Sequence, residues 1–193
     1  MSPASSKRRT QAERRAESRQ AVLDSALKLF GARGYAATSL EDIAADCGLT
    51  IRPIYHYYGN KKALFAAVND VMEQRILAVL HHDQPGVGLV ENWRAYLELC
   101  DDPAFRQVVL VDSPIVLGRE RWATSPVTEK ARAALGEEKG DDTAARVRRS
   151  LRNAVFMGAF TEAALAIAEA DDIDLARSEA EQLMSRLFEL VRD

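Results

Sequence analysis

The stretch from Thr38 to Lys62, TSLEDIAADCGLTIRPIYHYYGNKK, decides how this chain folds. Thr38 and Glu41 have the S/T-x-x-E spacing of a capping box, in which a hydroxyl and a carboxylate each satisfy a free N–H group at a helix start. Gly48 has the conformational freedom that a left-handed helix end requires. Between these two signals lies an apolar stripe at helical spacing: Leu40, Ile43, Ala44 and Cys47.

A second short helix is predicted directly after Gly48. Thr50 is a suitable N-cap, and Leu49 and Ile54 have the spacing of a hydrophobic staple. Pro53 falls in the first turn, where its missing N–H costs nothing. Asn60 then caps the next helix. The stretch is therefore predicted to form a helix-turn-helix.

The outward face of the second short helix favours DNA binding. If Ile54 and Tyr58 point inward, then the outward set is Ile51, Arg52, Tyr55 and His56. Arginine can bond guanine through two hydrogen bonds, and an aliphatic group can touch a thymine methyl group. Thr50, Tyr55 and Lys61 are placed for phosphate contacts. The alternative is a small helical subdomain with an aromatic-rich corner.

Residues 20–68 resemble the N-terminal domain of the tetracycline-repressor (TetR) family of bacterial regulators. The motifs that carry the resemblance are LFGARGYAATSLEDIA, CGLT and IYHYYGNKKALF. It implies an all-α homodimer whose C-terminal ligand pocket controls operator binding. The chain departs from the family pattern at Ile51 and Gly59, so no relative's operator can be assigned to it. The positions that match DNA contacts of the family are Thr38, Ser39, Thr50, Ile51, Arg52, Tyr55, Tyr57 and Lys61.

Charge divides the 193 residues into two parts. Residues 1–62 hold 11 Lys/Arg and 6 Asp/Glu, a balance of +5, whereas residues 63–193 hold 15 and 23, a balance of −8. Such asymmetry indicates a nucleic-acid-binding end. We expect about nine helices in two domains. The first, 1–62, is a basic arm and helix-turn-helix; the second, 63–193, binds ligand and forms the dimer, with a helix from about 60 to 82 connecting the lobes.

The arm from residue 1 to about 13 is either a solvated tail or a segment that follows DNA phosphates or enters the minor groove. The two cysteines and three histidines have no metal-ligand spacing, so no metal or cofactor is predicted. The N-terminus lacks the apolar run of a signal peptide, and no stretch approaches the roughly 18 apolar residues of a membrane span. We therefore expect a cytoplasmic protein without a membrane partner.

The C-terminal domain is predicted to hold the ligand. Three helices are expected over 88–123, with breaks at Asp101-Asp102-Pro103 and Asp112-Ser113-Pro114, and residues 136–142 read as a linker. Aromatic density in this region is typical of core packing, and taken together it also indicates a largely apolar cavity. The residues predicted to line it are Trp93, Tyr96, Phe105, Val109, Asp112, Trp122, Phe156 and Phe160.

The last two helices, near 143–170 and 175–191, are predicted to form a dimer. The first is apolar nearly all round, and a helix of that kind is buried on every side. Glu162 interrupts it and either bonds a structural partner or belongs to the ligand site. The residues assigned to the dimer interface are Val147, Leu151, Gly158, Leu165, Leu183 and Leu187.

Together these features predict a homodimeric transcriptional regulator that binds a double-stranded operator, most simply a repressor released by a small, largely apolar effector. The resemblance alone favours a repressor over an activator. One alternative is a small-molecule binding protein without DNA function, which a degraded outward face would have indicated. The other is an enzyme, but the sequence has no paired nucleophile and base, metal cluster or phosphate loop.

Overall fold

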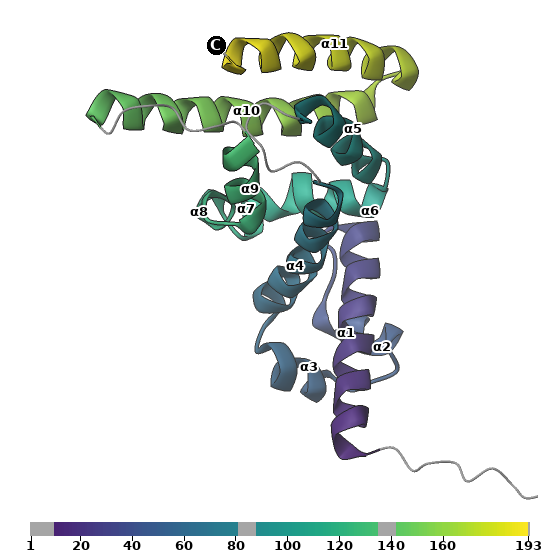
Figure 1. The fold of residues 1–193 in the computed structure, drawn as a ribbon. Coiled ribbons are helices and arrows are strands. Elements are labelled where there is room, and N and C mark those ends of the chain that lie inside the picture. Colours follow the sequence, from purple (N-terminus) through teal and green to yellow (C-terminus); the bar gives the residue numbers. More distant parts are fainter. Residues whose placement is uncertain (1–9, 81–87, 135–141, 193) are drawn as a thin grey trace, which may run out of the picture.

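The computed structural model describes residues 10–80, 88–134 and 142–192, and every regular element within these ranges is helical. The prediction of an all-α fold with an N-terminal helix-turn-helix is confirmed, although 103–123 is divided into more pieces than expected. In Figure 1 the long helices α10 and α11 lie side by side at the end of the molecule farthest from α2 and α3. The elements are α1 (Gln11–Arg33), α2 (Leu40–Asp46), α3 (Ile51–Tyr58), α4 (Lys61–Val79), α5 (Leu89–Cys100), α6 (Pro103–Phe105), the π-helix η1 (Arg106–Asp112), α7 (Ser113–Val116), α8 (Arg119–Ala123), α9 (Pro126–Ala134), α10 (Thr143–Glu169) and α11 (Ile173–Arg192).

The cap of α2 is displaced by one residue from the prediction. Ser39, not Thr38, is the N-cap, and its reciprocal partner is Asp42 rather than Glu41. Thr38 is 1% exposed, and its hydroxyl donates to the carbonyl groups of Gly34 and Leu29 at 2.9 and 3.3 Å. The Thr38 hydroxyl therefore fixes the turn after α1 instead of starting α2.

The helix-turn-helix is held by one continuous core. Phe30 and Phe65 meet edge to face with ring centres 5.3 Å apart, and Tyr35 packs on both rings. Ile54 of α3 is fully buried. Gly48 has a φ of +68°, as the predicted left-handed turn requires. The fully buried aliphatic residues that join α1, α2 and α4 to this core are Val22, Ala26, Ile43, Leu64 and Val68.

Helix α4 leads from α3 along α1 to the middle of the molecule, where it meets η1 (Figure 1). Asn60 caps it through a 2.8 Å hydrogen bond from the Ala63 N–H, as predicted. The helix ends at Val79 rather than near 82. Residues 81–87 and 135–141 lie outside the described residues, and so do nearly all of the predicted loop and linker. Residues 1–9 of the predicted arm lie outside them too.

The predicted break at Asp112-Ser113-Pro114 is wrong, whereas the break at Asp102-Pro103 is confirmed. Asp102 caps α6 and Pro103 takes its first position. Asp112 and Ser113 instead keep helical dihedral angles, and the chain passes from η1 directly into α7. Ser113 is fully buried and accepts a hydrogen bond from the Trp122 indole at 2.9 Å, so its hydroxyl serves packing between α7 and α8.

Helix α10 corrects the expectation that no stretch of the chain approaches a membrane span. It is long and apolar enough to cross a membrane, with a mean hydropathy of 1.2 over an 18-residue window, because its charged residues gather in the first turns. Length and composition alone are weak evidence for a membrane span, since the core helix of a soluble protein passes the same test. Only 17% of the window is buried within the described chain. The helix therefore exposes an apolar face.

Candidate nucleic-acid interface

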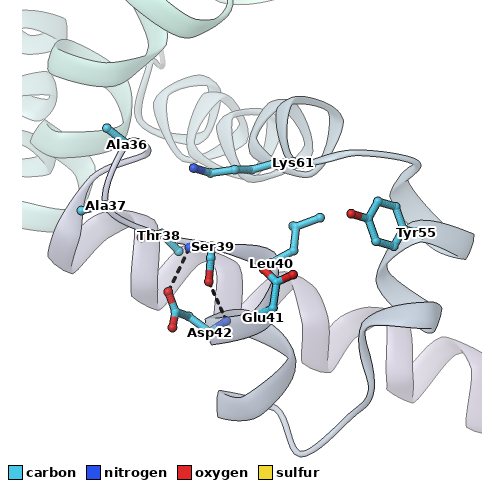
Figure 2. Close-up of a pocket in the computed structure, with 9 residues that line it drawn as sticks. All are labelled: Ala36, Ala37, Thr38, Ser39, Leu40, Glu41, Asp42, Tyr55 and Lys61. Atoms are coloured by element: carbon cyan, nitrogen blue, oxygen red, sulfur yellow. Dashed lines mark hydrogen bonds between the residues drawn. The ribbon is translucent and has the colours of Figure 1, made fainter.

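An open hollow lies where α2, α3 and α4 begin or meet. Its volume is about 420 Å³. Figure 2 shows the start of α2 along one side, with the Tyr55 hydroxyl and the Lys61 side chain directed into the space from α3 and α4. Backbone N–H groups at helix starts, a phenol and an ammonium group are the donors that hold phosphate oxygens. The lining residues are Ala36, Ala37, Thr38, Ser39, Leu40, Glu41, Asp42, Tyr55 and Lys61.

Lys61 is held in place by an aromatic ring. Its ammonium nitrogen lies 4.2 Å from the centre of the Tyr35 ring, which is a cation–π contact. Tyr35 is itself packed on Phe30 and Phe65 of the core. The positive charge is thus aimed across the hollow by a rigid platform, which the sequence pattern did not reveal.

Two carboxylates also border the hollow. Hydrogen bonding from Ser39, first through its backbone N–H, lowers the pKa of Asp42, so this carboxylate is ionised at neutral pH. Its two capping bonds point along the helix start rather than into the open space (Figure 2). Glu41 is exposed. A phosphate here would rely on Lys61 and backbone N–H groups to offset these charges.

The outward face of α3 matches most of the prediction. Arg52 and His56 are exposed, and Tyr55 is 52% exposed. Tyr57 is half-buried beside His56, with ring centres 5.4 Å apart. Ile51 departs from the prediction, because it is partly buried against the core and is less available to a groove than its neighbours Arg52 and Tyr55.

The two hydroxyl residues at the helix starts behave differently from each other. Thr50 is the exposed N-cap of α3, and its side chain makes no capping hydrogen bond, so it is available for a phosphate. Ser39 is half-buried, and its hydroxyl accepts from the Asp42 N–H. Thr38 is withdrawn from the predicted side-chain contacts because its hydroxyl is buried and already bonded.

A tyrosine at the end of α3 sets the angle of this helix. The Tyr58 hydroxyl donates to the Arg19 carbonyl of α1 at 3.1 Å, and the Arg19 guanidinium lies 5.7 Å from the ring centre. Burial raises the pKa of Tyr58 above its ordinary value, so the phenol remains a donor. Its inward direction was predicted from the helical period; its bond to α1 was not.

Two family models cover most of the chain. Residues 22–68 match the model described as bacterial regulatory proteins of the tetR family, and residues 87–191 match the tetracyclin repressor-like C-terminal domain. The chain belongs to the TetR family. This family is made up of transcriptional regulators, so the prediction that the chain is not an enzyme is confirmed.

Individual relatives agree with the TetR assignment. The HTH-type transcriptional regulator AcrR of Shigella flexneri is 40% identical over 60 residues, which cover 31% of this chain and 28% of that protein. The HTH-type transcriptional repressor Rv3405c of Mycobacterium tuberculosis is 37% identical over 71 residues, or 37% of this chain and 38% of that one. Both alignments span well under half of the relatives' length.

A solved structure extends the likeness to nearly the whole chain. A TetR-family transcriptional regulator from Pectobacterium atrosepticum superposes with a TM-score of 0.61 at 29% identity. The match covers 93% of this chain and 95% of that one. The arrangement of the helices beyond α4 is thus that of a TetR-family regulator as well.

The residues predicted to line a ligand pocket in this TetR-family chain mostly pack together as an aromatic core. Trp93 and Phe160 meet edge to face at 4.8 Å, and Tyr96 contacts both rings. Phe105 lies 6.3 Å from Tyr96, and Phe156 lies 6.5 Å from Phe160. Among the described residues, the buried Trp93 indole N–H has no hydrogen-bond partner.

The remaining members of that predicted set have other neighbours or functions. The Asp112 carboxylate accepts from the Tyr35 backbone N–H at 2.7 Å and from the Gln107 amide at 3.1 Å. Trp122 bonds Ser113. Val109 is 4% exposed in the core. Glu162 is exposed. Asp112 therefore joins η1 to the DNA-binding domain.

Exposure divides the residues predicted to form the dimer. Val147, Leu151 and Leu183 are 52%, 61% and 64% exposed. Gly158 is exposed, and a Cβ atom there would meet nothing within 4 Å. Leu165 and Leu187 are instead half-buried against their own core. The pattern missed Val155, which is 58% exposed, and the buried Met184 and Phe188, which set the inner face of α11.

Proposed function

We propose that this chain is a transcriptional repressor that binds a near-palindromic double-stranded operator as a homodimer. The observation that carries the proposal is the exposed face of α3, with Arg52, Tyr55 and His56 beside the donor-lined hollow. This face lies in the part of the chain with a balance of +5 charges. Such a helix fits the major groove, where Arg52 would contact a base edge and Tyr55 and Lys61 would contact phosphates.

A second copy of the chain is the partner that the C-terminal helices support. Val147, Leu151 and Val155 of α10 and Leu183 of α11 leave more than half of each side chain in water. Contiguous apolar surface of this kind marks an interaction site. A dimer through α10 and α11 would place two α3 helices in successive major grooves, about 34 Å apart.

A small-molecule effector would control the operator affinity of this dimer. It would bind the C-terminal domain and favour a conformation in which the two α3 helices no longer match the groove spacing, which requires unequal affinity for two conformations. The protein would act in the cytoplasm, on chromosomal DNA.

The direct test is selection from random double-stranded DNA with the purified full chain. We expect enrichment of a sequence with two inverted half-sites, bound by a dimer in sedimentation velocity. Enrichment of a single half-site by a monomer would contradict the dimer, and no enrichment of any sequence would favour a ligand-binding protein without DNA function. The Arg52→Ala variant should lose the preference at one base pair of each half-site.

A further inference from the structure

A second cavity lies between α5, α10 and α11, away from the DNA-binding hollow. Its volume is about 170 Å³, and none of the residues predicted to line a ligand pocket borders it. It continues the packing of the aromatic core: Leu97 and Ala164 stand four residues beyond Trp93 and Phe160 on the same two helices. The cavity was not apparent in the sequence because its lining comes from three separate segments.

The cavity has an apolar wall and a charged rim. Leu97, Ala164 and Ile167 are each at most 5% exposed and form the wall. The rim is formed by Arg106, Arg177 and Asp101, and the side chains of Arg177 and Asp101 are 28% and 59% exposed. With two positive groups and one negative group, this rim carries one surplus positive charge.

The two arginines retain donors for a ligand. Arg106 donates from Nη1 to the Cys100 carbonyl, and Arg177 pairs through Nη2 with Asp101. A guanidinium has five N–H groups, and each of these described contacts uses one. Cys100 also borders the cavity, and burial raises its pKa to about 12, so a neutral thiol leaves the surplus positive charge intact.

Size and charge together define the class of ligand. An apolar cavity of about 150 Å³ holds one benzene molecule, whereas sites for drug-sized ligands begin near 300 Å³. A cation would face two guanidinium groups, and a phosphate dianion would bury charge against the apolar wall. We propose that this cavity binds a small monocarboxylate with a compact apolar body, its carboxylate on Arg106 and Arg177, and that this binding weakens DNA binding.

The coupling follows from the position of Arg106 as the first residue of η1. The last residue of the same segment, Asp112, accepts the Tyr35 backbone N–H at 2.7 Å in the DNA-binding domain. A π-helical turn is rare and is frequently found at functional sites. A carboxylate that draws Arg106 from the Cys100 carbonyl would therefore bias the segment that holds Tyr35.

The segment of residues 102–107 is closely packed against α1 and is therefore sensitive to small shifts. A Cβ atom at Gly31 of α1 would lie 2.4 Å from the Ala104 Cβ, and one at Gly34 would lie 3.0 Å from the Gln107 amide nitrogen. Asp102, beside the cavity rim, also pairs with Arg75 of α4 at 2.9 Å. Both α1 and α4 thus meet the segment that begins at the cavity. The weakening of DNA binding by the bound carboxylate rests on the proposed function, whereas ligand binding at the cavity does not.

Calorimetry with the full chain tests the site directly. Benzoate and 3-methylbutanoate should bind, and benzyl alcohol and benzylamine should bind at least tenfold more weakly. Arg177→Met should weaken benzoate binding at least tenfold. Arg94→Met is the matched control. Arg94 of α5 forms an ion pair with Glu181 of α11 at 3.2 Å, and neither residue lines the cavity. Ala168→Leu, which fills the cavity, should also weaken binding at least tenfold, with an unchanged circular dichroism spectrum.

Equal benzoate affinity in wild type, Arg177→Met and Ala168→Leu, or no binding of either acid, would overturn the site. DNA binding is then measured with and without benzoate. A loss of operator affinity that Arg177→Met abolishes supports the regulatory step, and an unchanged operator affinity at saturating benzoate overturns it. A chain that binds benzoate but selects no DNA would instead contradict the proposed function while leaving the site intact.

Discussion

The helix-turn-helix and the α10–α11 pair differ in how completely they bury their apolar side chains. In the first, Ile43, Ile54 and Phe65 are fully buried, and Tyr55 is the large apolar residue that is exposed. In the second, Leu151 and Leu183 are more than 60% exposed although both helices also have buried faces. The helix-turn-helix thus completes its own core, whereas the exposed apolar surface of α10 and α11 marks an interaction site, for which we propose a second copy of the chain.

The largest expected effect comes from charging the exposed apolar face of the second region. Gly158→Glu and Leu183→Glu should produce monomers with at least hundredfold weaker operator binding, because a dimer would bury an unpaired carboxylate. Ile115→Glu is the control, since Ile115 is 81% exposed on α7, outside these two helices. Sedimentation velocity gives the oligomeric state. A dimer in all three variants would place the interface elsewhere.

Leu187 is unsuitable for the same experiment. It is half-buried against its own core, next to Phe188, which is 3% exposed. A glutamate there would destabilise the protomer itself, and loss of the dimer would then have two causes. The exposed positions separate assembly from folding.

The contact between α1 of the DNA-binding domain and α6 should respond next. Gly31→Ala would place a methyl group 2.4 Å from the Ala104 side chain, and overpacking of this kind costs about 1–3 kcal/mol. The measurement is the free energy of unfolding in urea. Ala104→Gly should restore much of the loss in the double variant, because it removes the atom that clashes. Additive losses in the double variant would mean that the two residues do not meet.

The DNA face of the first region gives an effect of similar or smaller size. Arg52→Ala should cost about 1–3 kcal/mol on the selected operator and relax the preference at one base pair. Tyr55→Phe should weaken binding to all sequences by about 1 kcal/mol, since a phosphate contact carries no base information. Fluorescence anisotropy with the operator and a scrambled duplex separates the two. Unchanged affinity in both variants would remove α3 from the groove.

Removal of the basic arm tests a smaller contribution to the same face. The deletion should end at residue 9, because Thr10 and Glu13 form the capping box that starts α1. Loss of Lys7, Arg8 and Arg9 should make the slope of log affinity against log salt shallower by about 0.9 for each lost phosphate contact. An identical slope would assign the arm to solvent.

The two regions also differ in how far the sequence predicts them. Gly48, Asn60 and Pro103 are local signals, since each acts on the backbone within a few residues, and all three were placed correctly. The α2 cap was misplaced by one residue because Thr38–Glu41 and Ser39–Asp42 both fit the spacing. The choice between them depends on the burial of Thr38, which is a tertiary effect.

The C-terminal errors have tertiary causes as well. Continuity through Asp112 and Ser113 depends on the packing of η1 against α1 and on the bond between Ser113 and Trp122. The prediction assigned the regularly spaced leucines of α11 to its apolar stripe and did not include Met184 and Phe188, which are the buried pair. Helical periodicity gives the stripes of a helix, but the neighbouring elements decide which stripe turns inward.

The smallest predicted effect concerns α4, which leads from the helix-turn-helix to the C-terminal domain. Glu73 is 3% exposed, accepts from the Asn69 amide at 2.9 Å and lies 3.5 Å from the Arg121 guanidinium of α8. Burial raises the pKa of Glu73 above the ordinary value of 4.5, although Arg121 opposes this. Below pH 4.5 the Glu73 carboxyl group is mostly protonated in both the folded and the unfolded chain.

As the pH rises, the unfolded chain releases the Glu73 proton first, so the Glu73 contribution to stability is lost between pH 4.5 and the raised pKa. Glu73→Gln cannot titrate and should remove this loss. The free energy of unfolding of the variant should therefore gain on that of the wild type as the pH rises from 4.5 to 7. Asp70→Asn removes a neighbouring carboxylate that adds to the rise in the Glu73 pKa, so this variant should reduce the loss without abolishing it. A Glu73→Gln profile parallel to that of the wild type would mean that the buried carboxylate ionises as readily in the folded chain as in water, with α8 offsetting the whole cost of its burial on α4.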